Sequence, residues 1–309
     1  MGEVRWITVD DGSDGQRIDN FLRRRLKGLP RTRLYRLLRR GEVRVNGGRI
    51  KPDYRLEVGD KIRLPPVRTG ETAPAEPSQR VLERLSEAIV HEDDDLLVVA
   101  KPSGMAVHAG SGVAYGVVEA LRRLRPEAGY LDLAHRLDRH TSGLLILCKG
   151  RQALASVHDQ FREGSVDKRY LTLLRGRLPR GERPVAAKLA RHTGKGGETM
   201  VEVASDGKPS QTVFNTVERL NDWTLARARP VTGRMHQIRV HAAHAGYPVG
   251  GDERYGDGEA NRRLREAGLR RLFLHAERVS LNHPRGGKIT LEAAAPSDLT
   301  TCLERLRHD

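Results

Sequence analysis

The sequence predicts an α+β protein of two domains: a small helix–helix–hairpin domain, then a larger one with a mixed, mainly antiparallel β-sheet and flanking helices. Three observations predict it. Apolar residues near the start recur at helical spacing, a proline-rich stretch follows, and beyond it short apolar strands alternate unevenly with helical segments. At 309 residues the chain is long enough for two domains, the larger with a full core.

The small domain is expected over residues 12–66 and begins with two helices. The first places its apolar residues at i, i+3, i+4 and i+8, on one helical face: Ile18, Phe21, Leu22 and Leu26. The second turns Leu34, Leu37 and Leu38 inward. Thr32 is a suitable N-terminal cap for it and Gly41 a suitable stop.

A hairpin is expected to follow these helices. Residues 43–45 alternate Val-Arg-Val, Asn46-Gly47 is a typical two-residue turn, and the segment from Leu56 to Leu64 provides the returning strand. The fold of the small domain is therefore two helices and a small sheet.

Positive charge is concentrated in this domain. The chain carries a formal charge of +15, and residues 14–68 hold 17 Lys and Arg against 6 Asp and Glu, a net +11. Such clustering is typical of proteins that bind a polyanion. The candidate residues for binding this polyanion are Arg17, Arg31, Arg33, Arg36, Arg39, Arg40 and Arg44.

A membrane-surface protein is the competing interpretation of the charge. No apolar run exceeds about half a dozen residues, whereas a spanning helix needs roughly twenty, and the first residues contain no apolar signal core. Cys148 and Cys302 are too few for a disulfide framework and fit a reducing compartment. We therefore expect a cytoplasmic protein with no membrane partner.

Residues 67–85 are expected to form a linker, because Pro65, Pro66, Pro74 and Pro77 interrupt both helices and strands. The larger domain is expected over residues 86–309. Its predicted strands include 96–100, 143–147, 170–174, 211–214, 223–226 and 288–291, with helical stretches at 117–124, 153–163 and 236–245.

One nine-residue stretch is the strongest candidate for chemistry. Residues 135–143 read His-Arg-Leu-Asp-Arg-His-Thr-Ser-Gly and place Asp138 between two arginines. On composition alone Asp138 is half of an ion pair or a nucleophile kept ionised by cations. Leu137 interrupts the His-Arg-Asp tripeptide of protein kinases, and no glycine-rich loop followed by a Val-Ala-Ile-Lys strand lies upstream, so the kinase interpretation fails.

The same stretch resembles the signature of RluA-type pseudouridine synthases, and further motifs follow the family's order. They are residues 101–108 (Lys-Pro-Ser-Gly-Met-Ala-Val-His), 168–171 (Lys-Arg-Tyr-Leu), 231–241 (Val-Thr-Gly-Arg-Met-His-Gln-Ile-Arg-Val-His) and 271–276 (Arg-Leu-Phe-Leu-His-Ala). The small domain resembles the S4 RNA-binding domain through residues 17–19, 40–46 and 58–62. Its linker resembles that of family members acting on large-subunit ribosomal RNA.

The resemblance implies an isomerase that converts several uridines of 23S ribosomal RNA, or of its precursor particles, to pseudouridine. It assigns Asp138 as nucleophile, Arg239 as its ion-pair partner and Tyr170 as the residue that stacks on uracil. It assigns Arg136 to the gap left by the flipped-out base, and Leu274 to the opposite apolar wall. A carboxylate can attack without an activating base if it is ionised, and a nearby arginine favours that form.

Two other functions remain open on the residues alone. The first is a catalytically silent RNA-binding or ribosome-assembly factor on the same scaffold, against which the joint presence of Asp138, Tyr170 and Arg239 argues. The second is an RNA glycosidase, for which no acid partner is evident near Asp138. No cofactor is implied, and a monomer is the expected state. His236, His241 and His244 lack a Glu or Cys at ligand spacing, so no metal site is expected either.

Overall fold

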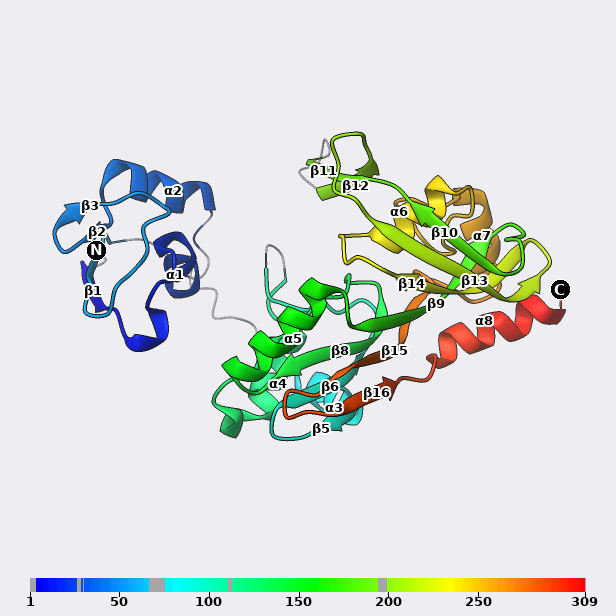
Figure 1. Ribbon diagram of the computed structural model, residues 1–309, viewed down its shortest axis with the longest axis horizontal. Helices are drawn as coiled ribbons and strands as arrows, with labels where there is room; N and C mark the ends of the chain where they lie inside the picture. Colours follow the sequence, from blue (N-terminus) through cyan, green and yellow to red (C-terminus); the bar gives the residue numbers. More distant parts are fainter. Residues whose placement is uncertain are drawn as a thin grey trace. The chain divides into compact units, whose positions relative to one another are not determined.

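The computed structural model describes residues 4–26, 29, 31–66, 76–110, 113–193 and 199–308. The chain divides into two compact units, Met1–Ala75 and Glu76–Asp309. Figure 1 draws both, coloured along the sequence. None of the described helices is both long enough and apolar enough to cross a lipid bilayer.

The smaller unit contains two helices and a four-stranded sheet. The helices are α1 (Ile18–Arg25) and α2 (Arg31–Arg40), and the strands are β1 (Arg5–Thr8), β2 (Arg44–Val45), β3 (Gly48–Arg49) and β4 (Lys61–Leu64), in the order β1-β4-β2-β3. All seven apolar residues expected on the inner helix faces are buried in one cluster with Val43, Val45 and Ile62. The helical spacing therefore predicted this core correctly.

The predicted turn is also present. Asn46 and Gly47 have φ of 49° and 80°, the left-handed values that a two-residue hairpin turn needs. Gly41 ends α2 with φ of 68°.

Two expectations for this unit were wrong. Helix α2 already includes Arg31, so Thr32 lies in its first turn and is not the cap. The returning strand covers only Lys61–Leu64, because the backbone N–H of Leu56 donates to Gln16 and the chain turns at Gly59 before pairing with β2. The sheet also gains β1, which pairs with β4.

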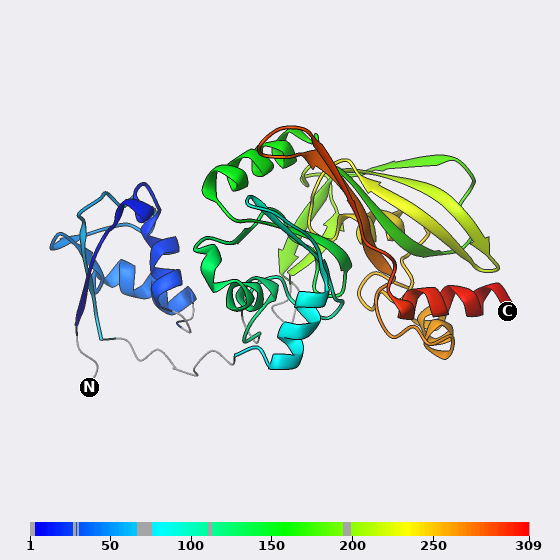
Figure 2. The ribbon, with the colours of Figure 1, turned by 90° about the horizontal axis from the view of Figure 1, so that it is seen from below.

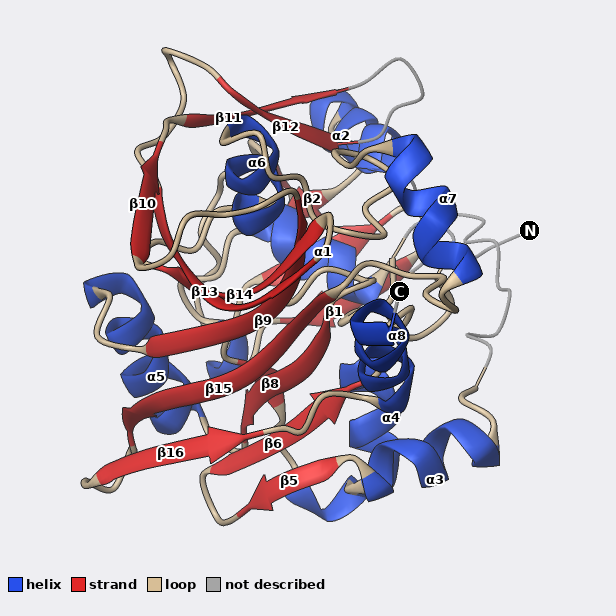
Figure 3. Ribbon diagram, turned by 90° about the vertical axis from the view of Figure 1, so that its right-hand side faces the viewer, coloured by secondary structure: helices blue, strands red, loops and turns tan. Residues whose placement is uncertain are grey.

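The larger unit is built on one mixed sheet, drawn in red in Figure 3. Its described strands run in the order β10-β13-β14-β9-β15-β8-β6-β5, with β16 paired to β15 and β7 to β8. They are β5 (Ile89–Glu92), β6 (Leu96–Lys101), β7 (Asp132–Leu133), β8 (Ser142–Cys148), β9 (Asp167–Arg175), β10 (Glu182–Ala186), β13 (Gln211–Leu220), β14 (Trp223–Pro230), β15 (Leu274–Asn282) and β16 (Lys288–Glu292). Only β15 and β8 pair in parallel among these, so the expected mainly antiparallel sheet is confirmed.

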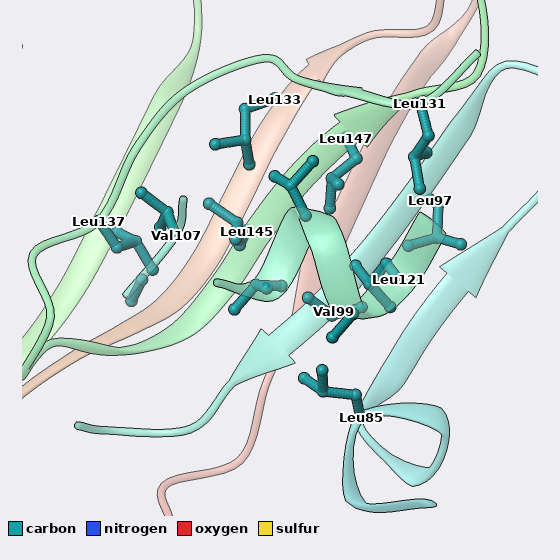
Figure 4. Close-up of a cluster of buried hydrophobic side chains, with 14 residues drawn as sticks. Leu85, Leu97, Val99, Val107, Leu121, Leu131, Leu133, Leu137, Leu145 and Leu147 are labelled. Atoms are coloured by element: carbon teal, nitrogen blue, oxygen red, sulfur yellow. The ribbon is translucent and has the colours of Figure 1, made fainter. Parts of the chain in front are cut away.

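The central strands are covered on both faces. Leu97, Val99, Leu145 and Leu147 pack with α4 (Val117–Leu124), as Figure 4 shows. The alternate residues Leu96, Val98, Leu144 and Ile146 pack with α5 (Arg151–Glu163). Because side chains alternate across a strand, the continuous apolar runs in the sequence supply both layers.

The other end of the sheet carries three further described helices. Helix α6 (Gln237–His244) packs against β13 and β14 inside the curve of the sheet (Figure 3), while α7 (Gly258–Glu266) and α8 (Ser297–His308) share a core with Leu173 and Phe273. Figure 2 follows β15 and β16 into α8 at the end of the chain. A separate hairpin, β11 (Leu189–Thr193) and β12 (Thr199–Val203), contacts α6 through Leu189, Val201 and Val240.

The segment expected as a linker, residues 67–85, lies partly outside the described residues. From Glu76 onward it groups with the larger unit and contains most of α3 (Gln79–Glu87). Leu85 of this helix is 1% exposed and belongs to the same buried cluster as Leu97 and Val99. Apolar burial thus ties α3 to the larger unit, although the prolines ahead of it are typical of a linker.

Gly143 lies where β8 approaches the backbone of β15 closely. Its φ is 106°, and a Cβ atom built on it would lie 2.3 Å from the carbonyl oxygen of Ala276. Only glycine fits both the left-handed backbone and this contact. The glycine of the Thr-Ser-Gly motif, five residues after Asp138, therefore allows β8 and β15 to pair in parallel.

We predict that Gly143→Ala destabilises the protein by more than about 2 kcal/mol, through backbone strain and collision with Ala276. Calorimetric unfolding of the full chain measures this. Gly258→Ala, in the exposed first turn of α7 where no atom lies within 4 Å of the added Cβ, is the control and should be neutral or slightly stabilising. Equal unfolding temperatures for the two variants would contradict the prediction.

Candidate active site

All five site residues expected in the larger domain line one cavity of about 830 Å³. They come from separate parts of the chain: Arg136 and Asp138 from the loop between β7 and β8, Tyr170 from β9, Leu274 from β15 and Arg239 from α6. The fold therefore collects the residues that the sequence motifs singled out.

The loop that carries Arg136 and Asp138 is anchored by the apolar residue between them, Leu137. Leu137 is 4% exposed and packs into the cluster shared with Val107 and Leu145, while Arg136 is exposed and Asp138 half-buried. The backbone N–H of Thr141 donates to the Asp138 carbonyl, 3.1 Å away, and closes a turn. Arg136 and Asp138 consequently both face the cavity, as alternation in an extended segment predicts.

The buried side chain of Lys101 fixes this loop by hydrogen bonds. Its side chain is 1% exposed, and Nζ donates to the carbonyl oxygens of Pro102, Met105 and Arg139 at 2.9, 2.9 and 3.0 Å. Burial, aided by the charge of Arg271 and opposed by that of Asp138, lowers the pKa of Lys101 to about 7. Three carbonyl acceptors require three N–H donors, so the geometry fits the protonated amine.

Arg239 connects Asp138 to a second, buried carboxylate. Its Nε and Nη2 donate to the two oxygens of Asp252 at 2.7 and 2.8 Å, and Nη1 lies 3.3 Å from Asp138 Oδ2. Burial alone would lower the pKa of Arg239, but the hydrogen bonds and charge of Asp252, with a smaller effect of Asp138, raise it overall. The guanidinium is therefore a permanent cation facing Asp138.

Asp252 is fixed as firmly as Arg239. It is 1% exposed, and Oδ1 also accepts from the backbone N–H groups of Arg254 and Tyr255. Burial raises the pKa of Asp252, but Arg239 outweighs this effect and the pKa is lowered. Sequence reasoning missed Asp252, because a single aspartate after two glycines carries no distinctive signal.

Tyr170 and Leu274 lie diagonally on one face of the β9–β15 pair. In its register Tyr170 is opposite Ala276 and Thr172 is opposite Leu274, so the two side chains project to the same side. Leu274 is 4% exposed, and burial together with the charge of Asp138 raises the pKa of Tyr170. The phenol therefore stays neutral beside the carboxylate.

His236, His241 and His244, at which no metal site was expected, lie in three different environments. His241 is fully buried between the hydroxyls of Ser210 and Thr212, and His244 is exposed. His236 lines the cavity, with Nε2 3.7 Å from Asp138 Oδ2 and Nδ1 2.8 Å from the Tyr255 hydroxyl. Sequence reasoning considered His236 only for metal binding, packing or RNA contact, and overlooked Tyr255.

In the smaller unit, α2 presents Arg33, Arg36, Arg39 and Arg40 as exposed side chains. Arg44 is exposed on β2 and donates to the Gly41 carbonyl. Arg17 pairs with Asp19 through two hydrogen bonds, which leaves it less available to a phosphate. The side chain of Arg31 lies outside the described residues. Arg23, Arg24 and Arg25 in the last turn of α1 are also exposed, and they were not among the predicted contacts.

The amino-acid sequence is similar to known families and proteins. The RNA pseudouridylate synthase family matches residues 95–244, and the S4 domain matches residues 16–62. Ribosomal large subunit pseudouridine synthase C of Escherichia coli (strain K12) is 50% identical over 307 residues, covering 98% of this chain and 96% of that protein. The protein of the same name from Haemophilus influenzae is 46% identical, covering 98% and 95%.

A solved structure agrees with these sequence matches. Human RNA Pseudouridylate Synthase Domain Containing 1 aligns with a TM-score of 0.59 at 26% identity, covering 76% of this chain and 98% of that one. The resemblance inferred from the ordered motifs is thereby confirmed. The chain belongs to the RNA pseudouridylate synthase family and carries an S4 domain ahead of its catalytic domain.

Proposed function

We propose that this protein isomerises several uridines of 23S ribosomal RNA to pseudouridine, with Asp138 as the nucleophile. The names of its relatives support the ribosomal substrate. The observation that carries the catalytic assignment is the contact between Asp138 Oδ2 and Arg239 inside the cavity that Tyr170 also lines. The proposal includes a cytoplasmic monomer that uses neither metal nor cofactor.

The reaction needs a base that has left its helix. Flipping a uridine costs a few kcal/mol, and the exposed Arg136 at the cavity is long enough to occupy the vacated position. The flipped uracil then stacks on Tyr170, with Leu274 as the neighbouring apolar wall on the same face of the sheet. Arg162, Arg191 and Arg234 are exposed at the same cavity and suit the phosphates beside the target.

The chemistry is an isomerisation without external reactants. Asp138 attacks as a carboxylate and forms a covalent bond to the uridine, the bond between N1 and ribose C1′ breaks, and the uracil turns. C5 then bonds to C1′ and the bond to Asp138 breaks, which frees the carboxylate for the next uridine. The proton on C5 is lost and N1 gains one, so the atoms balance. The ion pair with Arg239 favours the ionised carboxylate that this attack needs.

Release of tritium tests the proposal against the two alternatives. With RNA tritiated at uridine C5, isomerisation releases tritium to water, glycosidic cleavage releases tritiated uracil, and a silent binding protein releases neither. Tritiated water together with pseudouridine in digested RNA is the expected result. Free uracil, or no release from a protein that binds the RNA, would overturn the proposal.

We predict that Asp138→Asn abolishes turnover while leaving RNA affinity nearly unchanged. The amide preserves the shape but is not a nucleophile, and most of the binding free energy comes from phosphate contacts. Single-turnover assays with excess enzyme measure the rate, and filter binding measures the affinity. Appreciable pseudouridine from this variant would remove Asp138 as the nucleophile.

A second prediction separates catalysis from folding at the Asp138–Arg239–Asp252 cluster. Arg239→Met should destabilise the protein by roughly 3–5 kcal/mol, because it leaves the buried Asp252 without a countercharge. Adding Asp252→Asn should restore most of this stability without restoring turnover, since Asp138 still lacks its cation. Unfolding and single-turnover rates are measured on both variants. A stable double variant with the wild-type rate would show that Asp138 does not need Arg239.

A third prediction concerns recruitment by the S4 domain. Replacing Arg33, Arg36 and Arg40 with Gln should weaken RNA binding and flatten its salt dependence by roughly 0.7–0.9 log units of slope per lost phosphate contact. The maximal rate at saturating RNA should fall much less. The matched control replaces Arg262, Arg265 and Arg270, which are exposed on and after α7. Equal affinity and equal slope for both triple variants would remove α2 as the RNA anchor.

A further inference from the structure

His236 has a backbone conformation unusual for its residue type. It precedes α6 with φ of 53° and ψ of 15°, in the left-handed region, and is only 9% exposed. Non-glycine residues seldom adopt this backbone conformation, and such strain persists where surrounding contacts impose it. Here it accompanies an imidazole placed between Asp138 on one side and Tyr255 on the other.

The hydrogen bonds around Tyr255 determine where the proton of His236 lies. The Tyr255 hydroxyl accepts from the backbone N–H of Val201 at 3.1 Å, so its own hydrogen is available for His236 Nδ1 at 2.8 Å. A neutral imidazole that accepts at Nδ1 carries its hydrogen on Nε2. Nε2 is the nitrogen that faces Asp138 Oδ2.

The surroundings keep this imidazole neutral. Burial is the largest influence and lowers the pKa of His236 to about 4. Among the charges that face it, Arg239 and Arg254 lower the pKa further, whereas Asp138 and Asp252 oppose them. At neutral pH His236 is therefore an N–H donor without a charge.

Both donors near the nucleophile approach the same oxygen. Arg239 Nη1 is 3.3 Å and His236 Nε2 is 3.7 Å from Oδ2, while Oδ1 has no hydrogen-bond partner in the described part of the chain. The histidine distance exceeds that of a formed hydrogen bond. Contacts of this kind in empty active sites commonly tighten when substrate binds.

We propose that His236 is a positioning residue for Asp138, whose Nε2–H is directed at Oδ2 by Tyr255 so that Oδ1 is presented to the uridine. This inference rests on the proposed function, in which Asp138 is the nucleophile. Since Val201 belongs to β12, the β11–β12 hairpin takes part in holding the Tyr255 hydroxyl and thus the tautomer of His236.

The tautomer is tested first, because its measurement requires no activity. Nitrogen-15 NMR of the full chain labelled in histidine distinguishes the two neutral tautomers and the cation, and the His236→Gln spectrum identifies the signal. The expected state at pH 7 is neutral with the hydrogen on Nε2, and Tyr255→Phe should shift population toward Nδ1–H. A cation, or Nδ1–H in the wild-type protein, would overturn the proposal.

The effect on catalysis is tested with two carboxamides that differ by one methylene. The Gln amide nitrogen can occupy the place of Nε2, whereas the shorter Asn amide cannot reach Asp138, although Asn suits a left-handed backbone better. We expect His236→Asn to lose roughly 10- to 100-fold in single-turnover rate, the usual value of a hydrogen bond to a charged group, with RNA affinity retained. His236→Gln should keep most of the rate.

The matched control is His244→Gln, an exposed histidine on the same helix, which should react at the wild-type rate. Equal losses for the Gln and Asn variants, with both folded, would overturn a positioning role. If neither variant folds, the NMR result decides. Full activity in Asp138→Asn would instead refute the proposed nucleophile, so failure of this inference and failure of the proposed function give different results.

Discussion

The buried ion pair between Asp252 and Arg239 is the interaction on which the rest of the site depends. Two charges in an apolar interior are costly unless each is fully hydrogen-bonded. Here the bidentate geometry satisfies two guanidinium nitrogens, and backbone N–H groups of Arg254 and Tyr255 satisfy Asp252 further. The remaining nitrogen, Nη1, is then directed at Asp138. A lysine could supply the charge, but it lacks the planar guanidinium whose two bonds to Asp252 direct Nη1 at Asp138.

The site joins segments that are distant in the sequence, and the parallel pairing of β8 with β15 is one of the contacts that connect them. Gly143 allows the strands to approach, and beside it the Arg271 guanidinium donates to Ser142 Oγ. The neighbouring His275 accepts from Ser142 at Nδ1 and donates from Nε2 to the Ala293 carbonyl. Burial lowers the pKa of His275, and a neutral imidazole meets both requirements. Ser142, His275 and Arg271 thus form a structural hydrogen-bond network where β8 meets β15.

The sequence predicted those features that depend on local pattern. Helical spacing identified the core of the small domain, alternation identified the central strands, and the ordered motifs identified Asp138, Tyr170 and Arg239, which the fold brings to one cavity. It did not predict Asp252 or Tyr255, because their importance comes from contacts with Arg239 and His236 that only the folded chain creates. Thr32 was misassigned because the end of a short helix depends on the neighbouring backbone as much as on the capping residue.

Arginines have different surroundings in the two units, being exposed on α2 and mostly buried at Arg239. The arginines of α2 are exposed, so their attraction to phosphates acts through water and is weakened by salt over a Debye length of about 8–10 Å. Arg239 has a side chain only 12% exposed, and its attraction to Asp138 is screened far less. Salt therefore weakens the attraction of the α2 arginines for an anion far more than it weakens the attraction of Arg239 for Asp138.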